Sequence, residues 1–261
     1  MVRLQRSYTF FSKRRFKIYD WIKPRNRWRL DIMVKKSFSN KVILITGGSS
    51  GLGRTYTNFF LKEGATVIAC SRRNNFKNKI YSNNSKFNYY KLDLTKIEKL
   101  KKFIKKLIKK FKKIDILINN AGIALPQKVE SLRHANLLST FKVNFFAPSI
   151  ITKEVIKIMK KNNYGRIINI SSGGAVNCAE NYFSYSASKA ALNTLTKTLS
   201  KEIKKSNIKI NSMSPGPCKT RMFPKNTLST KLSLPTIKHL ASLGPKGPSG
   251  KFFWFLNEIE I

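Results

Sequence analysis

The chain has 261 residues, enough for one domain with a well-buried core, and its 41% hydrophobic content excludes a globally disordered protein. No apolar run approaches the roughly 20 residues that a membrane-spanning helix needs. Three cysteines without close spacing exclude a disulfide framework or a zinc ribbon, and no metal site is expected.

The formal net charge is +40, from 52 Lys and Arg against 12 Asp and Glu. Residues 1–40 hold 12 basic and 2 acidic residues, and the remaining surplus is spread over the chain without one localised patch. This spread favours compositional drift toward lysine. The alternative is electrostatic recruitment to nucleic acid, an anionic membrane or an acidic partner, although no specific nucleic acid is expected.

Residues 1–40 are predicted to be a basic N-terminal extension, ahead of a domain spanning residues 41–261. The extension mixes Arg and Lys with aromatic residues and lacks the continuous apolar stretch of a secretory signal. Two interpretations stay open. One is a disordered tail or a translation start nearer Met33, and the other is targeting or surface attachment. A cytoplasmic location is expected.

From residue 41 onward, strand patterns alternate with helix patterns. Strands are predicted at 42–45, 66–70, 87–92, 114–118, 166–170, 208–210 and 249–255. Helices are predicted at 54–63, 96–113, 138–161 with a bend near Pro148, 187–204 and 236–243. This alternation predicts an α/β domain with a doubly wound parallel sheet, the Rossmann fold, and ligands outside the carboxyl ends of the strands. About a dozen residues separate Met222 from Pro235, which predicts a short substrate lid.

A glycine-rich turn, residues 46–53, joins the first strand to the first helix. Gly47, Gly51 and Gly53 permit a tight turn, close approach to a pyrophosphate and close packing of helix on strand. The helix that follows offers its free N–H groups to phosphates. The turn therefore predicts a dinucleotide site.

The end of the second strand favours NADP(H) over NAD(H). Arg72 and Arg73 stand there, and no acidic residue occurs between Glu63 and Asp93. A carboxylate at this place would bind the ribose 2′-hydroxyl of NAD, whereas guanidinium groups bind the 2′-phosphate of NADP.

With Asn119-Asn-Ala-Gly122, Ser172, Tyr185-x-x-x-Lys189 and Pro215-Gly216 in order, the chain resembles the short-chain dehydrogenase/reductase family over roughly residues 40–261. The resemblance implies a single-domain oxidoreductase that forms a homodimer or homotetramer. It also implies cofactor contacts from residues along the strand ends. Besides the glycines and arginines already named, these are Ser49, Ser50, Leu52, Asp93, Leu94, Asn120, Ala121, Gly122, Tyr185, Lys189, Pro215, Gly216, Cys218 and Thr220.

Tyr185 and Lys189 lie one helical turn apart and predict acid–base chemistry. A phenol ionises near pH ~10, and the ammonium of Lys189, assisted by an oxidised nicotinamide, is expected to lower that value. Tyr185 then donates a proton to a carbonyl oxygen or removes one from an alcohol, while Ser172 hydrogen-bonds the same oxygen. By resemblance, Lys189 also holds the nicotinamide ribose, and Asn144 anchors a water that relays protons.

The leading hypothesis is an NADP(H)-dependent carbonyl reductase or alcohol dehydrogenase. Its substrate is a small carbonyl or alcohol compound held by Ser172 and Tyr185, and a carrier-bound 3-oxoacyl thioester is one candidate. The alternatives are a non-catalytic NADP-binding protein, and a membrane- or nucleic-acid-associated protein driven by charge.

Overall fold

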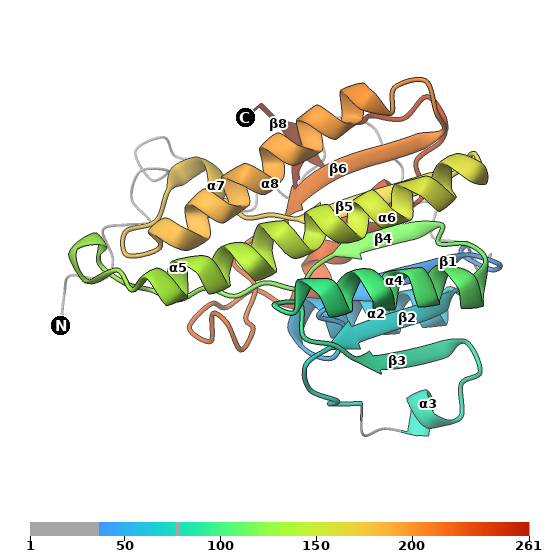
Figure 1. Ribbon diagram of the computed structural model, residues 1–261, viewed down its shortest axis with the longest axis horizontal. Helices are drawn as coiled ribbons and strands as arrows, with labels where there is room; N and C mark the ends of the chain where they lie inside the picture. Colours follow the sequence, from blue (N-terminus) through green and yellow to red (C-terminus); the bar gives the residue numbers. More distant parts are fainter. Residues whose placement is uncertain (1–36, 77–78, 261) are drawn as a thin grey trace.

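The computed structural model describes residues 37–76 and 79–260. Its strands, most of which are short apolar runs, pair into one sheet (Figure 1). The strands are β1 (Val42–Thr46), β2 (Thr66–Ser71), β3 (Phe87–Lys91), β4 (Ile116–Asn119), β5 (Gly165–Ile170), β6 (Ile208–Ser214), β7 (Phe252–Trp254) and β8 (Asn257–Ile259). Their order across the sheet is β3-β2-β1-β4-β5-β6-β7-β8, and β8 runs antiparallel to β7 while the other pairs are parallel.

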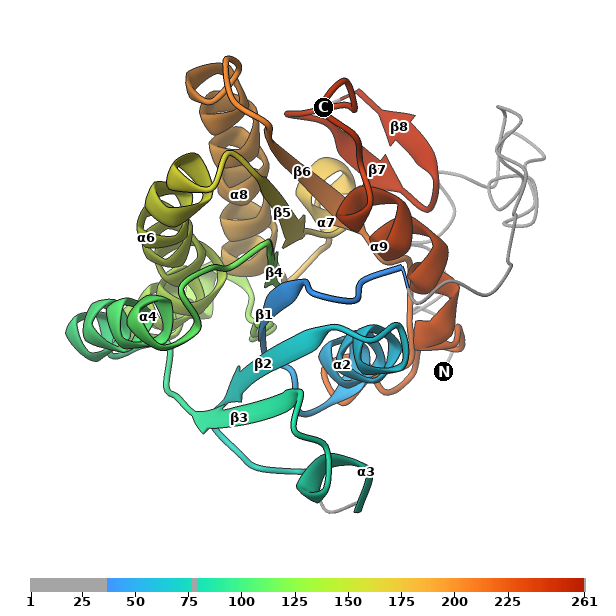
Figure 2. The same cartoon turned by 90° about the vertical axis from the view of Figure 1, so that its right-hand side faces the viewer.

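Helices cover both faces of this sheet, which explains why every residue of β1, β4 and β5 is buried. The helices are α2 (Gly51–Lys62), α3 (Lys79–Ser82), α4 (Ile97–Phe111), α5 (His134–Phe141), α6 (Ala147–Lys161), α7 (Gly174–Asn177), α8 (Phe183–Glu202) and α9 (Leu234–Ala241). Figure 2 shows α4, α6 and α8 on one face and α2 and α9 on the other. Each layer has its own apolar core. The predicted α/β doubly wound parallel sheet is confirmed.

Strand order reverses beside β1, where β2 lies on one side and β4 on the other. Ile45 of β1 pairs with Ile118 of β4, so these two strands end side by side. The glycine turn after Thr46 and the segment after Asn119 therefore meet at the carboxyl edge of the sheet. Such a switch point is where open α/β sheets bind ligands.

The predicted helix at 138–161 begins earlier, at His134, and contains a wider turn than an α-helix. A π-helical turn, Lys142–Phe146, separates α5 from α6. Pro148 follows at once, and a proline has no N–H to donate and collides with the carbonyl four residues before it, which is that of Asn144. The wide turn avoids this clash, and it holds Asn144 at its middle.

Several boundaries in the second half of the chain differ from the sequence predictions, and those of α8 and the last strand matter most. Helix α8 begins at Phe183, four residues before the predicted start, so Tyr185 lies inside the helix. The predicted strand 249–255 is shorter, as β7, and the unpredicted β8 folds back to pair with it through residues 257–259.

The folded domain begins before residue 41. Phe38 is 2% exposed, and its ring packs edge-on against Phe59 and Phe60 of α2 at centroid distances of 6.4 and 5.0 Å. Its N–H also donates to the carbonyl oxygen of Glu63 at 3.2 Å. The predictions for residues 1–36 lie outside the described residues. Within residues 37–76 and 79–260, no helix is long and apolar enough to cross a membrane.

Candidate active site

The turn between β1 and α2 has no room for a side chain at its last glycine. A Cβ on Gly53 would lie 2.2 Å from the carbonyl oxygen of Gly47, and Gly47 and Gly51 have φ angles of 67° and 50°. Ser50, at the N-cap of α2, makes no side-chain capping bond in the described structure. The first N–H groups of the helix thus keep their capacity to bind an anion. These features fit the pyrophosphate of a dinucleotide.

Thr46 and Asn120 join the glycine turn to the segment after β4. The Thr46 hydroxyl oxygen accepts hydrogen bonds from the N–H groups of Asn120 and Ala121, both at 3.0 Å. The Asn120 side-chain amide donates in return to the Thr46 carbonyl oxygen at 2.9 Å. Two predicted cofactor-binding segments are therefore one rigid unit.

Arg72, which follows β2, and Asp93, which follows β3, are both predicted to contact the adenosine half of the cofactor, and they lie close enough for their charges to interact. Arg72 and Arg73 are exposed. Partial burial raises the pKa of the Asp93 carboxyl, but hydrogen bonds from Thr95 and the charge of Arg72 lower it, and the net pKa is below its usual range. Arg72 and Asp93 thus share one neighbourhood. Leu94, the residue after Asp93, is buried.

Tyr185 and Ser172 meet where β5 ends and α8 begins. Tyr185 is buried, with 8% of its surface exposed. Burial raises the pKa of its phenol, a hydrogen bond with Ser172 lowers it in part, and neighbouring Tyr182 raises it further. The pKa of this phenol is therefore raised rather than lowered for these side chains alone, because desolvation outweighs the hydrogen bond with Ser172.

Lys189 lies beneath Tyr185 with its Nζ 5.8 Å from the centre of the tyrosine ring. The Nζ donates a hydrogen bond to the carbonyl oxygen of Ile170, at the end of β5, at 2.7 Å. Burial lowers the pKa of Lys189 from its ordinary value of 10.5 to about 8. The ammonium of Lys189 is therefore buried, and a backbone carbonyl oxygen accepts its hydrogen bond.

Asn144 is fully buried and holds the chain beyond β4 in place. Its Oδ1 accepts from the N–H of Ile123, and its Nδ2 donates to the carbonyl oxygen of Ile123, both at 2.9 Å. The Nδ2 also donates to the hydroxyl of Ser188 at 3.0 Å. A Cβ on Gly122 would lie 3.4 Å from Asn144 Oδ1 and 3.5 Å from Lys189 Nζ, so both polar groups border this glycine.

The segment after β6 returns to the glycine turn. A Cβ on Gly51 would touch the Thr220 methyl group at 3.4 Å, which places Thr220 against the pyrophosphate cradle. Gly216 has φ of 77°, and the buried Cys218 thiol donates to the Pro215 carbonyl oxygen at 3.2 Å. Burial raises the pKa of Cys218 to about 11, so this cysteine stays a neutral thiol that packs the loop.

The same segment carries an aromatic contact that the sequence did not indicate. The Phe223 ring packs against Tyr182 and Tyr185, each at a centroid distance of 5.9 Å. Tyr182 and Tyr185 lie 6.3 Å apart, so the three rings form a cluster. Phe223 thus covers the predicted catalytic tyrosine.

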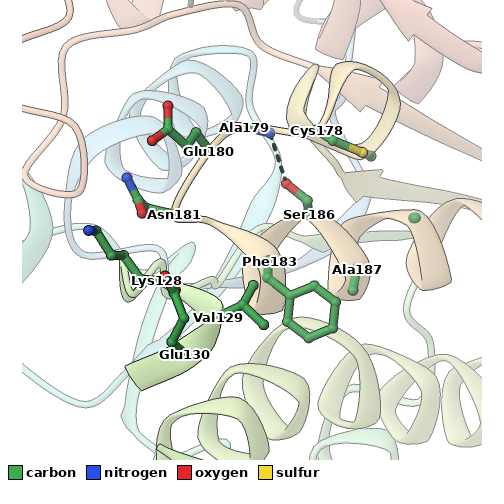
Figure 3. A pocket seen from close by; sticks show the side chains of 12 residues that line it. Lys128, Val129, Glu130, Cys178, Ala179, Glu180, Asn181, Phe183, Ser186 and Ala187 are labelled. Carbon is green, nitrogen blue, oxygen red and sulfur yellow. Dashed lines mark hydrogen bonds between the residues drawn. The ribbon is translucent and has the colours of Figure 1, made fainter. Parts of the chain in front are cut away.

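A cavity of about 620 Å³ lies between the start of α8, the α7–α8 loop and the short 3₁₀ turn Val129–Ser131. Figure 3 shows the side chains of Val129 and Phe183 next to each other in its lining. None of the four predicted catalytic residues lines the cavity. In the part of the chain that the structure describes, no group of three His, Cys, Asp or Glu side chains could hold a metal ion.

Residues 41–230 match the short chain dehydrogenase family. The chain is 34% identical over 200 residues to the 3-oxoacyl-[acyl-carrier-protein] reductase of Thermotoga maritima, covering 74% of this chain and 81% of that protein. It also resembles two solved structures, each covering 82% of this chain and 96% of the other. These are 4-hydroxyisoleucine dehydrogenase complexed with NADH (TM-score 0.74, 31% identity) and ElxO with NADP bound (TM-score 0.75, 27% identity).

Proposed function

This chain belongs to the short chain dehydrogenase family, and on that premise we propose that it is an NADP(H)-dependent oxidoreductase of carbonyl compounds or secondary alcohols. The observation that supports this best is the joint position of Ser172, Tyr185 and Lys189 at the carboxyl end of β5. This position lies next to a glycine turn that has no space for a Cβ at Gly53.

The glycine turn and the arginine pair would hold the cofactor. Gly47, Gly51 and Gly53 leave the backbone open to a pyrophosphate, while Arg72 and Arg73 would bind the 2′-phosphate through charge-assisted hydrogen bonds. The nicotinamide, when bound, supplies a hydride to a carbonyl carbon or accepts one from an alcohol carbon.

Tyr185 is the proton donor in the reducing direction. Burial raises the pKa of its phenol, so the hydroxyl carries its proton at neutral pH and can donate it to a carbonyl oxygen. Ser172 hydrogen-bonds the same oxygen and stabilises its developing negative charge. Below about pH 8 Lys189 is an ammonium that stabilises the phenolate left behind, and Asn144 fixes the loop at Ile123 next to it.

A 3-oxoacyl thioester on an acidic carrier is the substrate class we favour. The Thermotoga maritima relative is, by its name, a reductase of 3-oxoacyl-[acyl-carrier-protein]. The rings of Tyr182 and Phe223 offer an apolar surface beside Tyr185, which suits an acyl chain. The net charge of +40 suits an acidic carrier.

We also propose a cytoplasmic homodimer or homotetramer. Large apolar side chains are exposed on neighbouring elements, as an association surface requires. They are Val129, Leu138, Phe146, Val176 and Phe183, on the Val129–Ser131 turn, α5, the π turn, α7 and α8. Light scattering in moderate salt, which screens repulsion between +40 chains, should give a multiple of the monomer mass, and a clean monomer would contradict this assignment.

The proposed activity is tested by NADPH oxidation against 3-oxoacyl thioesters, sugars, steroids and small ketones. Turnover of at least one class supports the proposal. Binding of NADPH without any turnover would favour a non-catalytic cofactor-binding protein. Salt-dependent binding of RNA or anionic vesicles without turnover would favour a protein that acts by charge.

A further inference from the structure

Arg54 joins two loops that are separate in the sequence. It lies in the first turn of α2, directly after the glycine turn. Its Nε donates to the carbonyl oxygen of Ser49 at 3.0 Å, and its Nη2 donates to the carbonyl oxygen of Asn75 at 2.7 Å. Ser49 belongs to the glycine turn, and Asn75 lies three residues beyond Arg72. One guanidinium group therefore bridges the two segments predicted to bind phosphate.

The segment after β2 is held at three places, and Arg54 provides the middle one. At its start the Ser71 hydroxyl donates to the carbonyl oxygen of Arg73 at 2.8 Å. At its end the Phe76 ring packs against Tyr81 and Phe87 at centroid distances of 4.6 and 4.7 Å. The side chains of the arginine pair are exposed, but the backbone that carries them is fixed.

We propose that Arg54 is a positioning residue for cofactor discrimination, which sets the spacing between the pyrophosphate cradle and the arginine pair. The inference rests on the proposed NADP(H) dependence. A cofactor with a 2′-phosphate must engage both loops at once, so its affinity depends on a spacing fixed before binding. A cofactor without the 2′-phosphate needs the glycine turn alone and depends on that spacing much less.

Arginine suits this role better than lysine does. Its planar guanidinium directs two N–H groups from one rigid frame to two acceptors, whereas an ammonium is a point charge on a flexible stem. Arg54→Lys therefore keeps the charge near the phosphates and loses the bridge. Arg54→Gln loses the charge as well. If general attraction of phosphate were the role of Arg54, the lysine variant would behave as wild type.

The test is fluorescence titration of the full-length protein with NADPH and with NADH. Arg54→Lys should weaken NADPH binding about tenfold, the value of one charge-assisted hydrogen bond of moderate strength, and weaken NADH binding less than about threefold. The rate at saturating NADPH should stay near that of wild type. Arg133→Gln, which neutralises an exposed arginine far along the chain in front of α5, is the matched control and should change neither affinity.

A double-mutant cycle with Arg72→Ala separates positioning from a merely structural role. In the Arg72→Ala background only Arg73 is left to be positioned against the 2′-phosphate, so Arg54→Lys should cost less further NADPH affinity than it costs in wild type. Additive losses, equal losses for NADPH and NADH, or wild-type affinity of Arg54→Lys would each overturn the inference. If Arg54→Lys fails to fold by circular dichroism, Arg54→Gln takes its place in the same cycle.

Failure of the proposed cofactor preference gives a different result. In that case wild type binds NADH as tightly as NADPH, and Arg72→Ala changes neither affinity. The inference about Arg54 then falls with the preference on which it rests. If wild type prefers NADPH and Arg72→Ala removes that preference, the proposed function stands whatever Arg54 does.

Discussion

Replacing Lys189 with Met removes a buried ammonium, and we expect the variant to be more stable than wild type at neutral pH while it loses activity. Burial lowers the pKa of Lys189 from 10.5 to about 8. At about 1.4 kcal/mol per tenfold change in proton affinity, this corresponds to about 3 kcal/mol of unfavourable free energy at pH 7. The lost charge-assisted hydrogen bond to the Ile170 carbonyl oxygen offsets about 2 kcal/mol, leaving a net gain of about 1 kcal/mol.

The stability difference between wild type and Lys189→Met should change with pH. Below about pH 8, Lys189 is protonated in the folded and unfolded states alike, so its burial costs wild type the full amount. Between about pH 8 and 10.5 the unfolded chain binds a proton that the folded chain does not, and wild-type stability rises with pH relative to Lys189→Met. The advantage of the variant therefore shrinks across this window. For the same reason, carbonyl reduction by wild type should decline as pH rises through about 8.

The assay is denaturant unfolding of both proteins at pH 7, 8, 9 and 10, with Lys201→Met as the control. Lys201 is an exposed lysine on the same helix, and its replacement should shift stability by less than about 0.5 kcal/mol at each pH. If Lys189→Met is no more stable than wild type at pH 7 and their difference does not change with pH, Lys189 is not a desolvated ammonium, and our assignment of its role is wrong.

Three further substitutions test separate parts of the site. Arg72→Asp should lower NADPH affinity by at least tenfold in equilibrium titration and shift the preference toward NADH, because it replaces an attraction of about 1.5–3 kcal/mol with a repulsion. Equal use of both cofactors by wild type at two salt concentrations would argue against a role for Arg72 in binding the 2′-phosphate. Gly53→Ala puts a Cβ 2.2 Å from the Gly47 carbonyl oxygen, so it should lower the free energy of unfolding by about 1–3 kcal/mol and reduce NADPH binding. A variant that binds NADPH normally would contradict the assignment of the glycine turn to the pyrophosphate. Phe223→Ala should raise the KM for a carbonyl substrate several-fold with a smaller change in kcat, because about 1 kcal/mol of ring contact is lost. An unchanged KM would show that Phe223 is not part of the substrate site.

The parts of the fold that the sequence predicted correctly are those specified by local patterns. A buried strand that runs into a glycine turn needs no distant partner to be recognised, so the β1–α2 junction and the parallel sheet followed from residues 41–63 and the strands after them. The helix predicted at 138–161 begins earlier, at His134, and its π turn was not predicted, because the sequence shows Pro148 but not how the backbone avoids a clash with the Asn144 carbonyl.

The parts that could not be predicted depend on distant contacts. Nothing local indicates that Phe223 packs on Tyr185, 38 residues away in the chain. The acceptors of Arg54 are backbone carbonyl oxygens, which leave no trace in residue identity. Strand β8 is only three residues long, and its pairing with β7 overrides a weak local preference. The raised pKa of Tyr185 likewise comes from burial that only the packed structure supplies.

The central claim is that Tyr185 is the proton donor of a carbonyl reductase, and NADPH oxidation by wild type and Tyr185→Phe tests it most directly. The phenylalanine keeps the ring that packs against Tyr182 and Phe223 and removes only the hydroxyl. We expect turnover of the best carbonyl substrate to fall at least 100-fold, as loss of a general acid does, while NADPH affinity measured by fluorescence stays within about threefold of wild type. Turnover by Tyr185→Phe within a few-fold of wild type would show that another group supplies the proton and would contradict the proposed mechanism.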